Sequence, residues 1–300
     1  MQTFEEVLSS TIRAASRSPR RLDEGECQSP AGLRCKLCHA VNLDYESEVG
    51  MKNDALQQFW KSLRIGLPLA SLISSPLGRN YRTTTKRRLF SFHDSVRLGL
   101  ISPNEEGKLR PFSVVQCAIE PFAHCAIYHQ IQESIIKPHA KRFAKSLQYV
   151  IVKRNYDEQT VIFNVEDTSS EVLHAANTLS KSLTRKFPGI TGLFVYEDST
   201  SPQYYLGSKN QNKQPKFKKL FGKAEIFHRV LGRSFLHSPL SFSQINQSIL
   251  EKMILIAEEL LQPSKTSRLY DLYCGYGLFA LCLSGSVRSV VAVEVSSSSI

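Results

Sequence analysis

The stretch that decides the fold is RLYDLYCGYGLFALCLS (residues 268–284), followed closely by VRSVVAVEV (residues 287–295). This order predicts a strand, a glycine-containing turn, a short helix and a second strand that ends in an acid. Such a pattern holds a nucleoside-type cofactor at the edge of a parallel sheet. Gly275 and Gly277 allow the backbone to pass close to a ligand. Glu294, 17 residues after Gly277, is placed to accept hydrogen bonds from two ribose hydroxyls.

The two glycines alone leave the identity of the cofactor open. A dinucleotide fingerprint requires a third small residue three places after Gly277, where Ala280 stands, and a pyrophosphate at the helix N-terminus. Asp271, before the turn, favours S-adenosylmethionine, because a carboxylate suits the cationic methionine end of that molecule better than a pyrophosphate. Upstream, residues 243–261 have the apolar spacing of a long helix.

The middle of the chain has the alternating apolar pattern of strands with one helix between them, which predicts an α+β lobe. The predicted strands are RRLFSF (87–92), VRLGLIS (96–102), LQYVIVKR (147–154), QTVIFNV (159–165) and GLFVYE (192–197), and the helix covers 169–187. Shorter helices are predicted over 4–16 and 52–64.

Composition points to nucleic acid as the partner. The formal net charge of +11 and the pI near 9.3 favour a polyanion, although a generally basic surface would look the same. The N-terminus lacks the apolar run of a secretory signal, and no segment is apolar enough to span a membrane. We therefore expect a cytoplasmic protein that does not contact a membrane. Its 300 residues and 42% hydrophobic content predict two lobes.

Two basic clusters are interleaved with aromatic residues and could hold phosphates while stacking bases. Either cluster could equally be a solvated face. The first cluster contains Tyr81, Arg82, Lys86, Arg87 and Arg88, and the second contains Lys209, Lys213, Lys216, Phe217, Lys218 and Lys219.

Three of the seven cysteines fall within twelve residues. Cys27, Cys35 and Cys38 form a Cys-x7-Cys-x2-Cys pattern, in which the close pair can converge on one metal and the third can fold back to it. Cys117 is the best candidate for the fourth ligand, ahead of His39. Spacing alone leaves zinc and a [4Fe–4S] cluster open, since both accept four thiolates. In a cytoplasmic protein such a cluster favours ligation over disulfides.

Two motifs in the correct order resemble the RNA (uracil-5-)-methyltransferase family. DLYCGYGLFALCLS (271–284) is similar to the first methyltransferase motif of that family, and SPLSFSQIN (238–246) is similar to its Ser-Phe-Phe-Gln-x-Asn helix start, with Ser243 in place of the second Phe. Family members also include proteins with an N-terminal group of three cysteines and a distant fourth that hold [4Fe–4S]. The resemblance therefore favours this cluster at Cys27, Cys35, Cys38 and Cys117.

The resemblance implies a class I methyltransferase domain of the α/β, Rossmann-like type, of which this chain holds only the beginning. It implies that Gln244, Tyr273 and Glu294 contact S-adenosyl-L-methionine, with Asp271, Gly275 and Gly277 in the same site. The branch that it resembles most lacks an N-terminal RNA-binding barrel and methylates carbon 5 of a uridine in 23S ribosomal RNA; transfer RNA is the alternative substrate.

GRNYRTTTKRRLF (78–90) is similar to a family stretch that usually reads Tyr/Phe-Arg-Asn-Lys, with Thr83 and Thr84 in place of the last two residues. The family's nucleophilic cysteine and its proton-removing carboxylate follow the second motif strand, so we expect them beyond Ile300. Cys274 and Cys282 are expected to pack rather than to attack a base.

The expected organisation is an N-terminal iron–sulfur cysteine loop (1–50), a central α+β RNA-binding lobe (51–235) and the start of the methyltransferase domain (236–300). Two alternatives to an enzyme of this family stay open at this point. One is a non-catalytic RNA-binding remnant or fragment, and the other is a nucleotide-dependent enzyme of another class.

Overall fold

A computed structural model describes residues 3–15, 43–92, 95–103, 108–114, 116–198, 216–296 and 299. The first part is a helical pair, α1 (Phe4–Ala15) and α2 (Tyr45–Ser62). Helix α2 begins earlier than the predicted position 52, because the Asp44 carboxylate accepts a hydrogen bond from Ser47 N (2.7 Å) and caps the helix. The pair is held together by a small apolar cluster in which Phe4 and Phe59 pack with ring centroids 5.6 Å apart.

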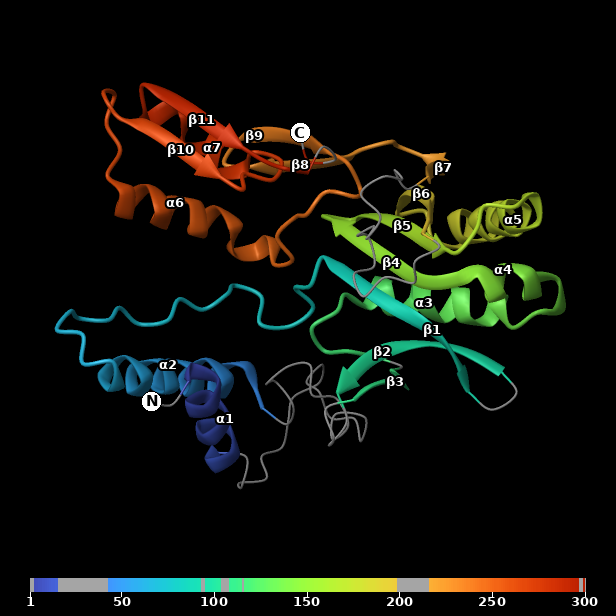
Figure 1. The fold of residues 1–300 in the computed structure, drawn as a ribbon, viewed down its shortest axis with the longest axis horizontal. Coiled ribbons are helices and arrows are strands. Elements are labelled where there is room, and N and C mark those ends of the chain that lie inside the picture. Colours follow the sequence, from blue (N-terminus) through green and yellow to red (C-terminus); the bar gives the residue numbers. More distant parts are fainter. Residues whose placement is uncertain are drawn as a thin grey trace.

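A seven-stranded mixed sheet forms the centre of the molecule, in the order β3-β2-β1-β4-β5-β6-β7 (Figure 1). Its strands are β1 (Thr84–Phe92), β2 (Ser95–Pro103), β3 (Leu109–Ser113), β4 (Leu147–Asn155), β5 (Glu158–Val165), β6 (Ile190–Glu197) and β7 (Lys216–Gly222). Strands β5 and β6 are parallel and the other neighbouring pairs are antiparallel. The strands predicted from the alternating pattern are found as β1, β2, β4, β5 and β6.

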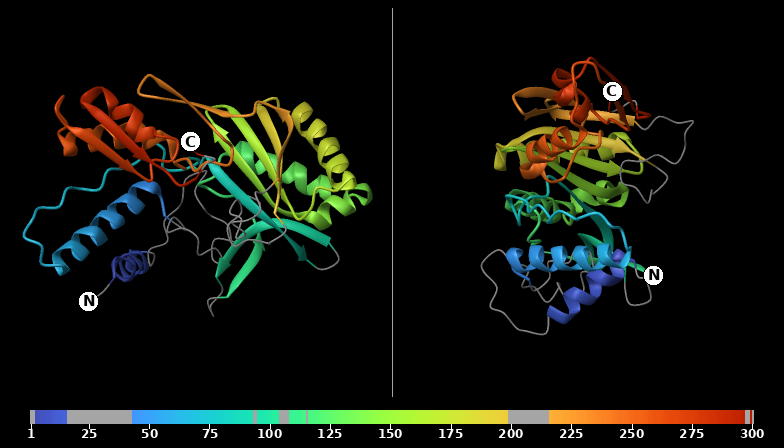
Figure 2. Two further views of the ribbon diagram at one scale, coloured as in Figure 1. Left: turned by 45° about the horizontal axis from the view of Figure 1, so that its top comes forward. Right: turned by 90° about the vertical axis from the view of Figure 1, so that its left-hand side faces the viewer.

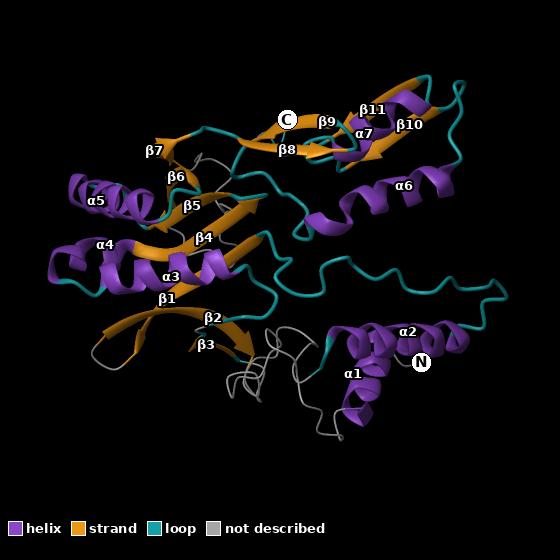
Figure 3. Cartoon of the chain, turned by 180° about the vertical axis from the view of Figure 1, so that it is seen from behind, coloured by secondary structure: helices purple, strands orange, loops and turns teal. Residues whose placement is uncertain are grey.

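Helices cover one face of this sheet, as Figure 3 shows from behind. They are α3 (Phe122–Ile135), the short 3-10 helix η2 (Pro138–Ala140), α4 (Lys141–Ser146) and α5 (Ser170–Lys186), which crosses from β5 to β6. Apolar side chains of α3, α4 and α5 pack against those of β4, β5 and β6 in the main hydrophobic core. Because β4 and β5 are buried on both faces, they read as nearly continuous apolar runs in the sequence.

The C-terminal part contains a β-hairpin and a β-α-β unit. The hairpin consists of β8 (Ile226–Val230) and β9 (Arg233–His237), and η3 (Gln247–Ile249) and α6 (Leu250–Leu261) follow it. The β-α-β unit consists of β10 (Arg268–Leu272), α7 (Leu278–Leu283), η4 (Ser284–Ser286) and β11 (Ser289–Val293), with β10 and β11 parallel. The predicted strand-turn-helix-strand order at 268–295 is therefore present.

The helix predicted over 243–261 is shorter in the structure. Residues 243–246 are not helical, because Thr83 N donates a hydrogen bond to Ile245 O (2.7 Å) and Arg82 forms an antiparallel bridge with Asn246. The extended segment 64–83 that provides these partners runs between α2 and α6 (Figures 1 and 2). Among the described residues, no helix is both long and apolar enough to cross a membrane.

Candidate cofactor-binding site

The turn between β10 and α7 has the left-handed backbone that a close-approach loop requires. Gly275 (φ +57°) and Gly277 (φ +77°) lie in this region, where glycine carries no steric penalty. Tyr273 (φ +63°) adopts it without being glycine, and its side chain is 87% exposed. The turn is fixed by hydrogen bonds from Cys274 N to Val293 O (3.1 Å) and from Gly277 N to Cys274 O (2.9 Å).

Asp271 organises this turn from the end of β10. Its Oδ2 accepts a hydrogen bond from Ala280 N (2.9 Å), one of the backbone donors in the first turn of α7 that lack a partner within the helix. A carboxylate at this end of a helix is also favoured by the helix dipole. Asp271 therefore has a structural role in the turn.

Glu294 closes the other side of the turn, directly after β11. Its Oε2 accepts from Gly275 N (2.9 Å), and its Oε1 accepts from Val295 N (2.9 Å) and Ser296 N (2.8 Å). These backbone donors, Ser296 first and then Gly275, hold the pKa of Glu294 below its usual range. A carboxylate offers about four acceptor positions, so two ribose hydroxyls can bind only if one of the three backbone bonds is exchanged.

The structure thus brings Asp271, Tyr273, Gly275, Gly277 and Glu294 together in one exposed turn. A Cβ atom added at Gly275 would meet nothing within 4 Å, so the backbone there faces open space. Gln244, the remaining predicted contact, lies at the boundary with the central lobe. Its carbonyl oxygen accepts from the Thr83 hydroxyl (3.2 Å), and it lines a small cavity of about 20 Å³.

An aromatic contact links that cavity to the glycine turn. The Tyr276 ring stacks on His237, with centroids 4.7 Å apart and planes at 19°, and His237 lines the same cavity as Gln244. The Tyr276 hydroxyl lies 3.4 Å from Nδ1 of His228, a second histidine of the β8–β9 hairpin. Burial lowers the pKa of His237 to about 4, so this histidine is neutral at pH 7.

Lys153 is a buried residue of this boundary that sequence reasoning did not single out. It is 5% exposed, its Nζ donates to Ser241 O (2.7 Å), and burial lowers its pKa to about 8. Its hydrogen bond holds the start of the 241–246 segment against β4. The sequence offers one signal for it, a lysine near the end of the apolar run LQYVIVKR, but that run does not indicate which segment covers the lysine.

Of the four cysteines predicted to hold a metal cluster, the structure describes Cys117 alone. Cys27, Cys35 and Cys38 lie outside the described residues. Cys117 precedes a turn in which Glu120 N donates to its carbonyl oxygen (3.0 Å). Within the described part of the chain, no three His, Cys, Asp or Glu side chains group closely enough to hold a metal ion.

Cys274 and Cys282 are both free thiols in the C-terminal part. Desolvation, followed by the charges of Asp271 and Glu294, raises the pKa of Cys274. Desolvation also raises the pKa of Cys282. The charge of Arg233 opposes the shift at Cys282 without reversing it, so neither thiol has the lowered pKa of an activated cysteine nucleophile.

The first basic cluster is split by the geometry of β1. Lys86 and Arg88 are exposed, whereas Arg87 is buried and forms two hydrogen bonds with Glu120 (2.6 and 2.5 Å). Alternation along a strand sends neighbouring side chains to opposite faces, which explains the split. Arg87 is therefore a structural residue, and the expectation that it contacts RNA with its neighbours is wrong for this side chain.

The second basic cluster is described only from Lys216 onward. Lys216, Lys218 and Lys219 are exposed on β7, but Lys216 pairs with Glu197 (3.1 Å). Phe217 stacks on Phe194 with centroids 4.7 Å apart and planes at 8°, so that face of its ring is already occupied. Lys218 and Lys219 are left as exposed positive charges at this edge of the sheet. Lys209 and Lys213 lie outside the described residues.

The sequence of this chain is similar to sequences of known RNA methyltransferases. Residues 218–300, which contain the whole glycine turn, match the model of the tRNA (uracil-5-)-methyltransferase family. An uncharacterized RNA methyltransferase of Clostridium tetani is 23% identical over 286 residues, which cover 90% of this chain and 59% of the relative. An uncharacterized RNA methyltransferase of Thermotoga maritima is 24% identical over 273 residues, which cover 88% of this chain and 57% of the relative.

The fold is also found in a solved structure. The tRNA (uracil-54, C5)-methyltransferase of Pyrococcus abyssi, in complex with S-adenosyl-L-homocysteine, superimposes with a TM-score of 0.59 at 16% identity. The match covers 85% of this chain and 58% of that one. The chain thus has an α/β fold with a central mixed sheet, similar to that of S-adenosylmethionine-dependent methyltransferases. It spans less than two thirds of the length of these relatives.

Proposed function

We propose that this chain is part of an S-adenosylmethionine-dependent enzyme that methylates carbon 5 of a uridine in RNA. The observation that carries the proposal is the glycine turn of residues 271–277 closed by Glu294, within the segment that matches a uracil-5-methyltransferase family. The proposed substrate is 23S ribosomal RNA, with transfer RNA as the alternative, and rRNA processing in the cytoplasm is the proposed setting.

The residues of the turn fit the proposed cofactor. Open space at Gly275 lets a ligand approach the backbone, and the half-buried Glu294 lies beside it, with its Oε2 accepting from Gly275 N. In this proposal Glu294 binds the ribose hydroxyls, Asp271 faces the cationic methionine end, and Gln244 and Tyr273 complete the site with Gly277. S-adenosyl-L-methionine supplies the methyl group when it is bound.

We further propose that methyl transfer requires residues outside this chain. The two cysteines near the turn, Cys274 and Cys282, have raised pKa values, so neither provides a thiolate nucleophile at neutral pH. In the proposed arrangement 236–300 begins the methyltransferase domain, 51–235 is the RNA-binding lobe, and 1–50 contains the cysteine loop. In this proposal the chain alone binds S-adenosylmethionine and RNA but does not transfer the methyl group.

An iron–sulfur cluster held by Cys27, Cys35, Cys38 and Cys117 is a separate proposal. Cys117 is half-buried, which leaves part of its side chain accessible to a ligand shared with another segment. Anaerobic purification with iron and sulfide analysis tests it. We expect about four iron and four sulfide ions per chain, lost in Cys117→Ser and retained in the matched Cys282→Ser variant. Bound zinc, or iron retained in Cys117→Ser, would contradict it.

The methylation proposal is tested with methyl-labelled S-adenosylmethionine and transcripts of 23S ribosomal RNA and transfer RNA, followed by nucleoside analysis. We expect 5-methyluridine from a form extended by the continuing reading frame, and ligand binding without transfer from the chain alone. 5-Methyluridine from the chain alone would overturn the assignment of the nucleophile. Binding of RNA without methyl transfer by the extended form would identify the alternative, a non-catalytic RNA-binding remnant.

A further inference from the structure

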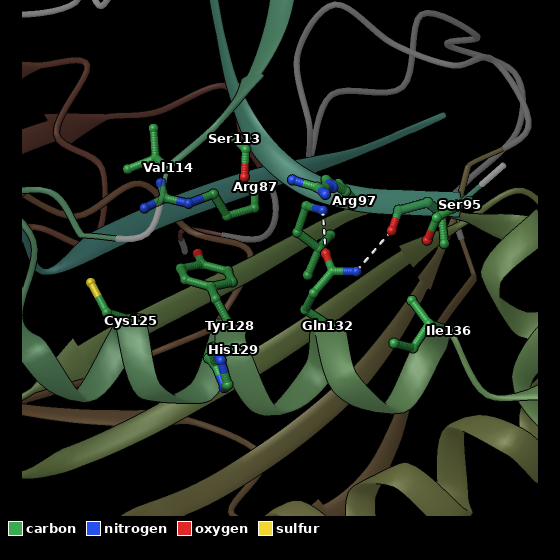
Figure 4. A pocket seen from close by; sticks show the side chains of 12 residues that line it. Arg87, Ser95, Arg97, Ser113, Val114, Cys125, Tyr128, His129, Gln132 and Ile136 are labelled. Carbon is green, nitrogen blue, oxygen red and sulfur yellow. Dashed lines mark hydrogen bonds between the residues drawn. The ribbon is translucent and has the colours of Figure 1, made fainter. Parts of the chain in front are cut away.

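A hollow lies between the β1–β2 hairpin and the corner where α3 leads into α4. It consists of two adjoining pockets of about 310 Å³ and 660 Å³ that share Ser95, Val96 and Ile136. Figure 4 shows the smaller pocket, with Ser95 on β2 facing Ile136 at the end of α3. Figures 1 and 2 show the α3–α4 corner at the opposite end of the molecule from β10 and β11. The hollow is therefore separate from the glycine turn.

The shape of the hollow is fixed by its own hydrogen bonds. The Gln132 side chain bridges α3 and β2, accepting from Leu98 N (2.6 Å) and donating to Val96 O (2.8 Å), as Figure 4 shows. The floor of the larger pocket is apolar and is formed by residues that include Leu89, Val96 and Leu147.

Three lysines stand at the rim of the larger pocket at intervals of four residues. Lys137, Lys141 and Lys145 are all exposed, and none forms an ion pair with a carboxylate in the described part of the chain. By contrast, Arg142, which does not line the hollow, pairs with Asp167 (3.2 Å) and Glu171 (3.9 Å). Lys141 and Lys145 are like charges four residues apart on α4, so a bound anion would relieve their repulsion.

From this geometry we propose that the hollow binds a single-stranded segment of RNA, with Lys137, Lys141 and Lys145 on successive phosphates and the apolar part of a nucleotide against the floor. The proposal rests on the proposed function, because that function supplies RNA as the partner, and it adds where a flanking part of the RNA is held. An apolar floor with a basic rim suits a nucleotide chain better than a free phosphate, which would use the charges alone.

The test compares two triple variants that remove the same charge. Lys137→Ala/Lys141→Ala/Lys145→Ala removes the rim, and Lys61→Ala/Lys181→Ala/Lys252→Ala removes three exposed lysines on α2, α5 and α6. The affinity of each for a fluorescein-labelled mixed-sequence RNA of roughly 16 nucleotides is measured by anisotropy at several salt concentrations. S-adenosylhomocysteine binding by each variant, measured separately, reports whether the cofactor site is intact.

We expect the rim variant to bind RNA about tenfold more weakly at low salt, with the slope of log affinity against log salt reduced by about 2, as loss of three phosphate contacts to a single strand requires. The control triple should stay within about twofold. An equal loss of RNA affinity in both triple variants overturns the proposal. So does an unchanged salt slope in the rim variant together with abolition of wild-type RNA binding by a glutamate-rich peptide. Either result leaves the methyltransferase assignment standing. Absence of RNA binding by the wild type overturns both.

Discussion

The central sheet and the β10–α7–β11 unit are both α/β structures, but they bury their strands very differently. Val150, Ile162 and Phe163 in β4 and β5 are 0% exposed. In the C-terminal unit, Leu272 is 62% and Val293 is 52% exposed. The central lobe is therefore stabilised by burial of apolar surface, whereas the glycine turn is held mainly by local hydrogen bonds.

This contrast separates the fold of the molecule from the geometry of its candidate site. Asp271 with Ala280 N, and Glu294 with Gly275 N, define the turn without a large core beneath it. A smaller cluster around Ile254 and Leu278 supports the unit. Stability and cofactor binding should thus respond to mutations in different regions.

The largest effect is expected from a cavity in the central core. Phe163→Ala should lower the free energy of unfolding by about 4 kcal/mol, because it removes a fully buried ring that packs edge-on against Phe143 at 5.4 Å. The matched change Leu272→Ala in the exposed strand should cost less than about 0.5 kcal/mol. Urea unfolding of both variants measures the difference, and equal losses would show that the two regions do not differ in this way.

The buried ion pair of the central lobe should give the next largest effect. Glu120→Gln leaves the Arg87 guanidinium charged, 2% exposed and without its carboxylate, which should cost about 3 kcal/mol. Asp157→Asn removes the carboxylate of an exposed pair with Arg154 at 3.9 Å and should change stability by less than about 0.5 kcal/mol. Thermal and urea unfolding of both variants check this, and a small loss in Glu120→Gln would mean that the site admits water.

The boundary between the two regions should show a pH dependence from Lys153. Its folded-state pKa of about 8 lies below the ordinary 10.5, so the unfolded chain binds more protons between these values. The contribution of Lys153 to the free energy of unfolding therefore rises with pH across that window, by about 3 kcal/mol. Unfolding of the wild type and of Lys153→Met is measured at pH 7, 8, 9 and 10. As the pH rises, the free energy of unfolding of the wild type should increase relative to that of Lys153→Met. A constant difference would contradict the burial of the Lys153 ammonium against Ser241 O.

The smallest effects are expected at two glycines that lie in open space. Gly275→Ala places a side chain at φ +57°, which should cost about 1 kcal/mol and also weaken cofactor binding. Gly50→Ala, within α2 and free of neighbours within 4 Å, should stabilise the protein by about 0.5–1 kcal/mol. Calorimetric unfolding should show changes in the free energy of unfolding of opposite sign for the two variants. Stabilisation of both would contradict the left-handed backbone of the turn.

Much of this arrangement was predictable from local patterns. The alternation in 147–165 predicted β4 and β5, and the spacing of Asp271, Gly275, Gly277 and Glu294 predicted one turn. These features depend on residues close in sequence or on a well-defined period, so a single chain carries their signal.

The remainder depends on contacts between distant segments. The pairing of Thr83 with Ile245 shortened a predicted helix, and the pairing of Arg87 with Glu120 removed a predicted phosphate ligand. The burial of Lys153 beneath Ser241 follows from the same boundary. Periodicity cannot specify such partners, since each lies more than thirty residues away.

Titration of S-adenosylhomocysteine into the protein by calorimetry tests the central claim most directly, with Glu294→Gln compared against the exposed Glu259→Gln of α6. We expect the wild type and Glu259→Gln to bind alike, Glu294→Gln to bind about tenfold more weakly through loss of a charged hydrogen-bond acceptor, and NAD to show no binding. Binding of NAD in place of S-adenosylhomocysteine, or equal affinity in Glu294→Gln, would contradict the assignment of the glycine turn.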